Sequence, residues 1–466
     1  MFAALRSTWA LFLGVGLIMT GAGLQNALLG VRATAEAFPT TAIGLVMSAF
    51  YLGFLGGSLL VPGIVQAVGH IRSFAALASL ASTAVLVHVI FIDPVTWGLM
   101  RLITGFAFAG LYIVAESWLN DRATNETRGQ LLSFYMMVGL IGMGGGQVLL
   151  NLASPEDFQL FILVSVLISL ALIPILLTAA PVPSFEAPEK VSVMQLYRAS
   201  PLGVVGCFGI GAAHGALLGM GAVYATSMGM SFVEVSAFMA AVYLGGALLQ
   251  WPVGKISDRF DRRRVITAVT LLTTATALAA LVAAQFSMLA LFVLTALFGG
   301  LTLPMYSLSV SHTNDFLEPQ QMVAASASLY LVTGVGAIMG PLGISWAMEL
   351  LGPMGFFVFL AAIHLAIGVF AIWRMTRRAA RPVEEQGHYA ATWAPASSQY
   401  ASVMAAEDTV AEMEEAAHAD THHGASQDGE MLSRPIDDPR ALGATGSEPE
   451  EGGADLEPGG EDRVVA

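Results

Sequence analysis

Residues 47–53 read MSAFYLG, and residues 239–245 read MAAVYLG. The motif ALLG also occurs twice, at 27–30 and at 216–219. A third correspondence relates four residues of the first half, in order, to four of the second: Gly105, Tyr112, Asn120 and Asp121 to Gly299, Tyr306, Asn314 and Asp315. All three offsets are about 190 residues, which is typical of an internal repeat. The sequence therefore predicts two halves of equivalent topology, with a functional site at the seam between them.

The composition excludes a soluble globular protein. Of the 466 residues, 56% are hydrophobic and 12% are charged, and the mean hydropathy is +0.70. A soluble domain of this length cannot bury so much apolar surface. A helix that crosses a bilayer needs about 20 apolar residues. Twelve stretches meet this requirement: 8–32, 40–66, 74–92, 95–118, 130–152, 158–179, 202–226, 232–253, 264–284, 287–311, 323–350 and 354–374.

The charged residues between these stretches predict their orientation. Basic residues fall in alternate connections or at the termini: Arg6, Arg72, Arg122, Arg128, Lys190, Arg198, Lys255, Arg259, Arg262–Arg264, Arg374, Arg377, Arg378 and Arg381. The remaining connections hold only Arg32 as a basic residue. Because loops rich in Lys and Arg stay in the cytoplasm, both termini are predicted to be cytoplasmic, which requires an even number of spans. An alternative, that the first span is a signal peptide cleaved near Ala33, is disfavoured by the length of its apolar run.

Most of the net charge of −14 lies at the C-terminal end. From Pro382 onward 19 acidic residues stand against three arginines, whereas the remainder has 17 basic and 15 acidic residues. Such a composition predicts a disordered tail; a short helix near 402–418 and a regulatory role are the alternatives. The predicted organisation is a six-helix bundle at 1–180, a cytoplasmic linker at 181–201, a second six-helix bundle at 202–380 and an acidic disordered cytoplasmic tail at 381–466.

The most specific local motif is GKISDRFDRRR at 254–264. It resembles the signature of the major facilitator superfamily, which reads approximately G-x-x-x-D-R-x-G-R-R between spans two and three and is often repeated between spans eight and nine. The first-half counterpart at 62–72 keeps Gly69 and Arg72 but lacks the acidic residue. The resemblance implies a latch that closes the cytoplasmic side, formed by eight residues: Gly254, Asp258, Arg259, Arg262, Arg263, Glu116, Arg128 and Asp315.

Arginine offers forked donors to carboxylates, so ion pairs are expected within this latch. In the first half, the expected partner of Glu116 is Arg72 or Arg128. In the second half, the expected pairs join Asp315 or Glu318 to Arg259 or Arg262. The alternative is that these arginines only anchor the topology.

A second resemblance lies in RLITGFAFAG at 101–110. Arg101 and Gly105 match the R-x-x-x-G motif of span four in the superfamily, whose arginine is often linked to proton coupling. An arginine in hydrocarbon costs at least about 2.5 kcal/mol, so it is expected to face a cavity or a partner. The alternative is that its side chain extends to the nearby membrane surface. AESWLNDR at 115–122, followed by RGQ at 128–130, is similar to the bacterial YcaD-like branch of the superfamily.

In this superfamily, spans one, four, seven and ten line a central cavity. The resemblance implies six substrate-binding residues on these spans: Gln25, Asn26, Arg101, Tyr112, His214 and Tyr306. Gln25 and His214 precede the two ALLG motifs, as expected of a site built across the repeat. None of the four spans has Asp or Glu near its middle, so Arg101 favours an anionic or polar neutral solute. The alternative for His214 is a hydrogen bond between helices.

The resemblance covers residues 1 to about 380 and implies an all-α membrane protein with 12 transmembrane helices in two pseudo-symmetric six-helix bundles. The expected function is secondary active transport of a small solute across the inner membrane by alternating access, with proton coupling as a hypothesis. The expected partners are the solute, protons and the lipid bilayer, with no nucleic acid, and the protein is expected to be a monomer. No phosphate loop, metal cluster or nucleophile is visible, so neither enzyme activity nor a cofactor is expected. The alternatives are a multidrug efflux antiporter and a membrane sensor that signals through the acidic tail.

Overall fold

The structure is a computed structural model that describes residues 2–124, 127–176, 191–377, 381–383, 386–387, 389, 391–392 and 397–413, with side chains described from Thr8 onward. The chain divides into two parts, Met1–Glu414 and Glu415–Ala466, and the second part lies outside the described residues. Residues 181–190 of the expected linker at 181–201 also lie outside them. The domain boundaries therefore stay predictions.

The regular structure of the described residues is helical, which confirms the all-α fold class. The first half contains α1 (Phe2–Ala35), α2 (Thr40–Val68), α3 (His70–Ile90), α4 (Pro94–Asp121), α5 (Arg128–Leu149), η1 (Leu150–Leu152) and α6 (Gln159–Leu176). The second half contains α7 (Val193–Ala199), α8 (Pro201–Ser227), α9 (Phe232–Ser257), α10 (Arg262–Ala283), α11 (Met288–Thr302), α12 (Met305–Asn314), α13 (Pro319–Leu351), η2 (Gly352–Met354) and α14 (Gly355–Met375). A further helix occupies 399–413.

Twelve helical stretches of the described residues coincide with the twelve predicted spans. Ten helical stretches in the described residues are long and apolar enough to cross a membrane, and one of them, Pro319–Met375, covers two of the predicted spans. That stretch contains two helices, α13 and α14, which are separated at Gly352, where φ is +65°. The remaining span is the shorter apolar helix α6. The span predicted at 287–311 is divided into α11 and α12 near Pro304, which cannot donate a backbone hydrogen bond.

Local sequence signals begin several of these helices. The Asp93 carboxylate accepts hydrogen bonds from the backbone amides of Val95 at 3.1 Å and Thr96 at 2.9 Å, and Pro94 occupies the first helical position of α4. Ser231 and Glu234 form a reciprocal capping box at the start of α9. Both arrangements satisfy backbone N–H groups that the first turn of a helix leaves without partners.

Close helix crossings at glycine occur at equivalent positions of the two halves. In the first half, a Cβ on Gly53 of α2 would overlap the carbonyl oxygen of Leu102 on α4. In the second half, a Cβ on Gly245 of α9 would overlap the carbonyl oxygen of Ala296 on α11. Gly53 and Gly245 are the last residues of the repeated heptapeptides, so small residues that permit close backbone approach explain part of the repeat.

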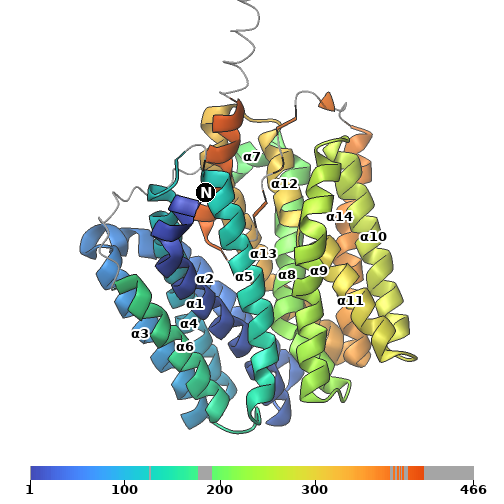
Figure 1. Cartoon of the computed structure of the whole chain (residues 1–466). Coiled ribbons are helices and arrows are strands. Elements are labelled where there is room, and N and C mark those ends of the chain that lie inside the picture. The colour runs from blue at the N-terminus through green and yellow to red at the C-terminus, as the bar shows by residue number, and fades with distance from the viewer. Residues whose placement is uncertain are drawn as a thin grey trace, which may run out of the picture. The chain divides into compact units, whose positions relative to one another are not determined.

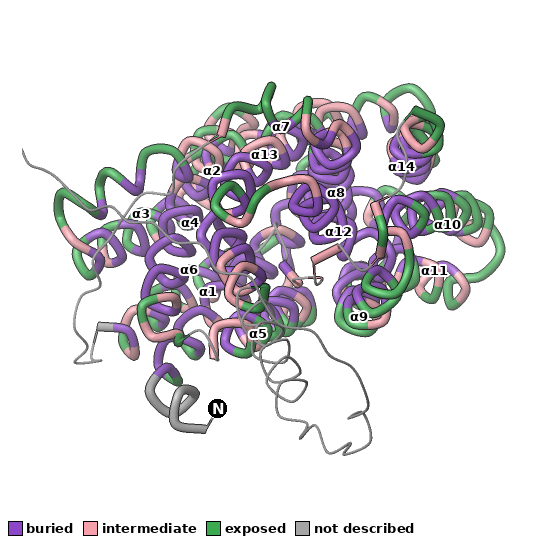
Figure 2. Tube along the Cα trace, turned by 90° about the horizontal axis from the view of Figure 1, so that it is seen from above, coloured by how far each residue is buried: buried purple, intermediate pink, exposed green. Residues whose placement is uncertain are grey.

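The helices of the two halves lie side by side, with the seam between them (Figures 1 and 2). The N-terminus and α7 lie at the same end of the helices, at the top of Figure 1. This end also carries the connections 122–127, 258–261 and 315–318, and we call it the basic face because Arg128 and Arg262–Arg264 lie there. The other end, with the connections 36–39, 91–93 and 228–231, is called the opposite face.

The two halves pack directly on each other toward the opposite face. Ser48 of α2 donates a hydrogen bond to the carbonyl oxygen of Ile338 on α13 at 2.5 Å. Asn151, just after α5, donates to the hydroxyl of Ser236 on α9 at 2.8 Å. Gly30 of α1 lies so close to α8 that a Cβ there would be 3.1 Å from the Cβ of Ala222. The two halves are therefore in direct contact on this side.

At the basic face the C-terminal segment, defined here as the described residues of 386–413, lies against both halves. Its residues 397–406 are buried, and Ser398 and Ala401 are both 0% exposed. The helix at 399–413 overlaps the short helix expected near 402–418, of which 414–418 lie outside the described residues. For 397–411 the structure thus differs from the solvated tail expected from 381 onward, because these residues are buried or partly buried against the helices around them.

Candidate functional site

Arg101 lies inside the first half, near the seam. Its side chain on α4 is directed into the protein, where the residue is 2% exposed. One terminal nitrogen, Nη2, donates to Oδ1 of Asn26 on α1 at 3.1 Å, and the guanidinium carbon lies 4.2 Å from the centre of the Phe50 ring. Nε and Nη1 have no hydrogen-bond partner among the described residues. The arginine is therefore buried rather than extended to the membrane surface, and two of its donor groups are free to bind another molecule.

His214 of α8 also has a free polar atom at the seam. Its Nε2 lies 3.0 Å from the carbonyl oxygen of Thr302, which can only accept, so Nε2 carries the hydrogen. The acceptor Nδ1 has no partner within the part of the chain that the structure describes. The hydroxyl of Thr302 is 2.9 Å from Nε2 of His364. His214 thus bonds between helices, as the alternative expected, and retains one acceptor.

A cavity at the seam is formed by one helix of the first half and two of the second. Its lining residues come from α2, α8 and α13: Phe50, Tyr51, Phe54, Leu55, Ser58, Gly211, His214, Gly215, Tyr330, Thr333, Gly334 and Ala337. Most of these side chains are apolar or aromatic. Of the six predicted substrate-binding residues, only His214 lines it; Arg101 lies behind the ring of Phe50.

The other predicted binding residues do not line this cavity. Gln25 is 1% exposed, and its Nε2 has no partner among the described residues. The Tyr112 ring packs 6.0 Å from that of Phe54. Tyr306 lies nearer the basic face, where its hydroxyl is 2.7 Å from that of Ser402 in the C-terminal segment. Phe50 and Tyr51 of the repeated heptapeptide line the cavity, although they were not predicted to be binding residues.

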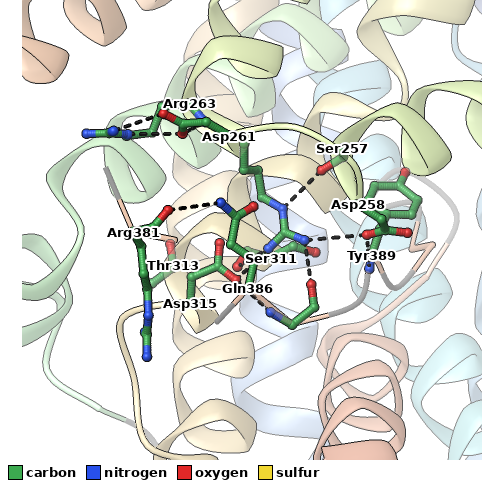
Figure 3. Close-up of polar contacts among 12 residues, drawn as sticks. Ser257, Asp258, Asp261, Arg263, Ser311, Thr313, Asp315, Arg381, Gln386 and Tyr389 are labelled. Atoms are coloured by element: carbon green, nitrogen blue, oxygen red, sulfur yellow. Dashed lines mark hydrogen bonds and ion pairs between the residues drawn. The ribbon is translucent and has the colours of Figure 1, made fainter. Parts of the chain in front are cut away.

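The latch motif forms a compact polar cluster at the basic face (Figure 3). Nη1 of Arg262 donates to Oδ1 of Asp315 at 2.6 Å, and this ion pair is buried, with side chains 1% and 3% exposed. Nε of Arg262 donates to the hydroxyl of Ser257 at 3.0 Å, while Asp258 lies 3.6 Å away. Burial raises the pKa of the Asp315 carboxyl above its ordinary value, although the charge of Arg262 opposes the rise. The expected pair of Asp315 with Arg262 is thus present.

The other latch residues take different partners. Arg263 pairs with Asp261 at 2.9 Å, whereas Arg259 is exposed and has no ion pair among the described residues. Nε of Arg128 donates to Oδ1 of Asn120 at 3.3 Å and lies 3.5 Å from the carboxylate of Glu407.

Glu116 is not paired with Arg72 or Arg128, which corrects the expected first-half ion pair. The Tyr135 hydroxyl donates to Glu116 at 2.8 Å, and the other donors to this carboxylate belong to Ser398 and Ala401 of the C-terminal segment. The physical reason is that Glu116 is directed to the seam, where backbone N–H groups can satisfy a carboxylate as well as an arginine can. Arg72 is exposed on α3.

No group of three or more His, Cys, Asp or Glu residues that could hold a metal ion occurs in the described part of the chain. Cys207 is buried and free. The site is therefore described by its aromatic lining, by the free nitrogens of Arg101 and His214, and by the polar cluster at the basic face.

Two repeated helical halves with a cavity at their seam define a class of multi-pass membrane proteins that carry solutes. The family model of the Major Facilitator Superfamily matches residues 11–258 and 205–404. The chain belongs to the major facilitator superfamily and is a membrane transporter.

Relatives and solved structures agree with this assignment. The uncharacterised MFS-type transporter YcaD of Escherichia fergusonii is 28% identical over 81% of this chain and 98% of its own. YcaD of Salmonella arizonae is 30% identical over 77% of this chain and 93% of its own. Among solved structures, the nucleoside transporter NupG has a TM-score of 0.64 at 15% identity and covers 80% of this chain and 99% of its own. A bacterial homologue of the human lysosomal transporter Spinster, in an inward-facing and unoccupied conformation, has a TM-score of 0.61 at 15% identity and covers 87% of this chain and 98% of its own.

Proposed function

We propose that this protein is a secondary active transporter that moves a small solute across the bacterial inner membrane by alternating access. The observation that carries the proposal is the cavity at the seam, which is enclosed by direct packing toward the opposite face. Toward the basic face the halves are bridged by the C-terminal segment. Because basic loops are retained in the cytoplasm, the basic face and both termini are assigned to the cytoplasmic side. On this assignment the conformation is an inward-facing one in which the C-terminal segment occupies the cytoplasmic mouth of the seam.

The free guanidinium nitrogens of Arg101 support an anionic or polar neutral solute. Arginine binds carboxylates and polar oxygens through paired N–H donors, and two of its nitrogens are without partners here. The solute would reach them by displacing the Phe50 ring, which stacks on the guanidinium. Proton coupling is proposed from the family, with His214 and Glu116 as the groups that would carry the proton. Transport that ignores an imposed pH gradient in proteoliposomes would remove the coupling from the proposal.

A second candidate, efflux of lipophilic compounds, is favoured by the aromatic lining of the same cavity. Phe50, Phe54 and Tyr330 offer apolar surface and ring faces, which are suited to amphipathic ligands and organic cations. The two candidates are separated by which compounds bind.

A ligand screen on the purified full-length protein tests both candidates. Melting temperature is measured with four sets of compounds: small carboxylates, sugars, nucleosides and lipophilic amines. For a carboxylate or polar ligand, Arg101→Ala is expected to weaken binding at least about tenfold, or about 1.4 kcal/mol, because the free donors are lost. Arg32→Ala is the matched control, since Arg32 pairs with Glu36 at the opposite face, away from the cavity. Unchanged affinity in Arg101→Ala would disqualify Arg101 as a contact, and stabilisation by lipophilic amines alone would favour efflux.

A further inference from the structure

We infer that the C-terminal segment is an autoinhibitory plug: the mouth of the seam at the basic face is a binding site for the described residues of this segment, in particular Gly387, Tyr389 and 397–413. The bound segment holds the two halves apart on that side. The consequence for transport rests on the proposed function, whereas the binding itself does not.

The N-terminus of the helix at 399–413 is capped by a carboxylate of the first half. Glu116 of α4 accepts hydrogen bonds from the backbone amide of Ser398 at 2.8 Å and from that of Ala401 at 3.0 Å. The hydroxyl of Ser398 donates to the same carboxylate. Free N–H groups and the positive end of the dipole at a helix N-terminus both favour a negative charge. Glu116 therefore caps a helix that is distant in sequence, and the cap is 0% exposed.

The start of this helix is bound by both halves. In the first half, the side-chain amide of Gln399 donates to the carbonyl oxygen of Ser58 on α2 at 3.0 Å. In the second half, the Tyr330 hydroxyl of α13 donates to the carbonyl oxygen of Ser397. Ser58 and Tyr330 also line the seam cavity, so the segment covers the cavity on the side of the basic face. A solute that leaves the cavity toward that face would have to pass these residues.

The extended part of the segment occupies the latch. The amide of Gly387 donates to Oδ1 of Asp315 at 3.1 Å, and its carbonyl oxygen accepts from Arg262 at 2.6 Å. The amide of Tyr389 donates to Oδ1 of Asp258 at 2.8 Å, as Figure 3 shows. A Cβ on Gly254 would lie 2.5 Å from the ring of Tyr389, so the glycine of the motif makes room for this ring. While the segment is bound, these latch groups face the chain's own C-terminal residues.

The sequence of the segment suits a buried position. Residues 386–406 contain no Asp, Glu, Lys or Arg, although acidic residues dominate the region from Pro382 onward. The first charges after this stretch are Glu407 and Asp408, which lie beside Arg128 and Gly129 at the start of α5. Next to these contacts, Pro319 and Val323 at the start of α13 line a shallow cavity together with Glu407 and Val410 of the helix. The uncharged stretch is thus the part that is buried at the seam, where its backbone amides serve the carboxylates, and the acidic residues that follow it lie beside Arg128.

The bound segment is incompatible with closure of the basic face. Alternating access requires the two halves to meet there, but a helix with its side chains is about 10 Å in diameter. Closure therefore requires the segment to leave, and its binding favours the conformation in which the cavity opens to the basic face.

Thiol accessibility tests the plug in the full-length chain. The buried cysteine is removed by Cys207→Ser, and Ser58→Cys introduces a reporter behind the segment; this change keeps the backbone oxygen that Gln399 binds. Reaction with a polar maleimide is followed in detergent micelles. Adding Ser398→Asp is expected to speed labelling at least about tenfold, because a second carboxylate would lie against that of Glu116 and expel the helix. Ser426→Asp is the control, since it adds the same charge outside the described residues.

A second measurement needs no introduced cysteine and compares the unchanged protein with Ser398→Asp. Tyr400 is 7% exposed, so limited chymotrypsin treatment is expected to leave the bond after Tyr400 intact while it cuts after this residue in Ser398→Asp. Mass spectrometry of the fragments gives the result. Rapid cleavage after Tyr400 in the unchanged chain, or equal labelling of Ser58→Cys with and without Ser398→Asp, would overturn the plug. Neither readout uses a transported solute, so a failure of the proposed function leaves both intact.

Discussion

Replacing Gly245 by alanine is expected to destabilise the protein by about 2 to 3 kcal/mol, because the new methyl group would overlap a backbone oxygen of a neighbouring helix. That oxygen belongs to Ala296 of α11 and cannot rotate away as a side chain could. The strain is relieved only when α9 and α11 separate along their contact. Gly53→Ala is expected to have a similar effect in the first half, where the overlapped oxygen belongs to Leu102. The free energy of unfolding of the purified protein in mixed micelles is the measurement.

Gly56→Ala is the matched control for this prediction. Gly56 lies on α2, three residues from Gly53, but an added Cβ there meets no atom within 4 Å. Its replacement is expected to change stability by less than about 0.5 kcal/mol. If Gly245→Ala were as mild as Gly56→Ala, the close crossing of α9 and α11 would be wrong. If Gly53→Ala and Gly245→Ala lowered the free energy of unfolding by very different amounts, the two helix crossings would not be packed equally closely.

The positions of the helices were predictable because lipid offers the backbone no hydrogen-bond partners. Each span must satisfy its own N–H and C=O groups, so long apolar stretches become helices. The predicted boundaries fall within a few residues of those observed, and the largest shifts arise where a span continues beyond the apolar core, as at the start of α1. The repeated heptapeptides also identified the equivalent halves, since Gly53 and Gly245 occupy the same kind of crossing.

The lining of the cavity was less predictable. Polar residues on spans one, four, seven and ten were expected there; of these spans only the seventh, α8, contributes to the lining, and the rest of it comes from α2 and α13. Which face of a transmembrane helix is turned to the seam depends on packing between helices, and helices that are apolar on all sides carry little periodic information about it. Arg101 was correctly expected to have a partner, but Asn26 and Phe50 as its partners could be found only in the folded chain.

The binding of the C-terminal segment was missed because composition was averaged over the whole tail. The acidic residues lie mainly beyond residue 406, and the uncharged stretch at 386–406 is visible in the sequence once shorter windows are taken. The partner of Glu116 was missed for a different reason. An opposite charge was sought, whereas the backbone N–H groups at a helix N-terminus serve a carboxylate equally well and leave no pattern in the sequence.

Asp315→Ala is expected to cost about 3 kcal/mol, because it leaves the buried guanidinium of Arg262 without its main counter-charge. Arg262 is 1% exposed, and its pair with Asp315 at 2.6 Å is the shortest of its ionic contacts among the described residues. Asp258 lies 3.6 Å from Arg262 and is 33% exposed, so it screens the charge less well. The loss is measured as a change in the free energy of unfolding in mixed micelles.

Two further variants separate the buried pair from a general effect of charge. Glu36→Gln breaks the pair with Arg32, which is partly exposed at the opposite face, and is expected to cost less than about 1 kcal/mol. The double variant Arg262→Met with Asp315→Ala is expected to be more stable than Asp315→Ala alone, because it removes the unpaired charge together with its partner. An Asp315→Ala variant that lost no more stability than Glu36→Gln would show that water reaches Arg262. The polar cluster would then have to be an open surface rather than a site sealed by the C-terminal segment.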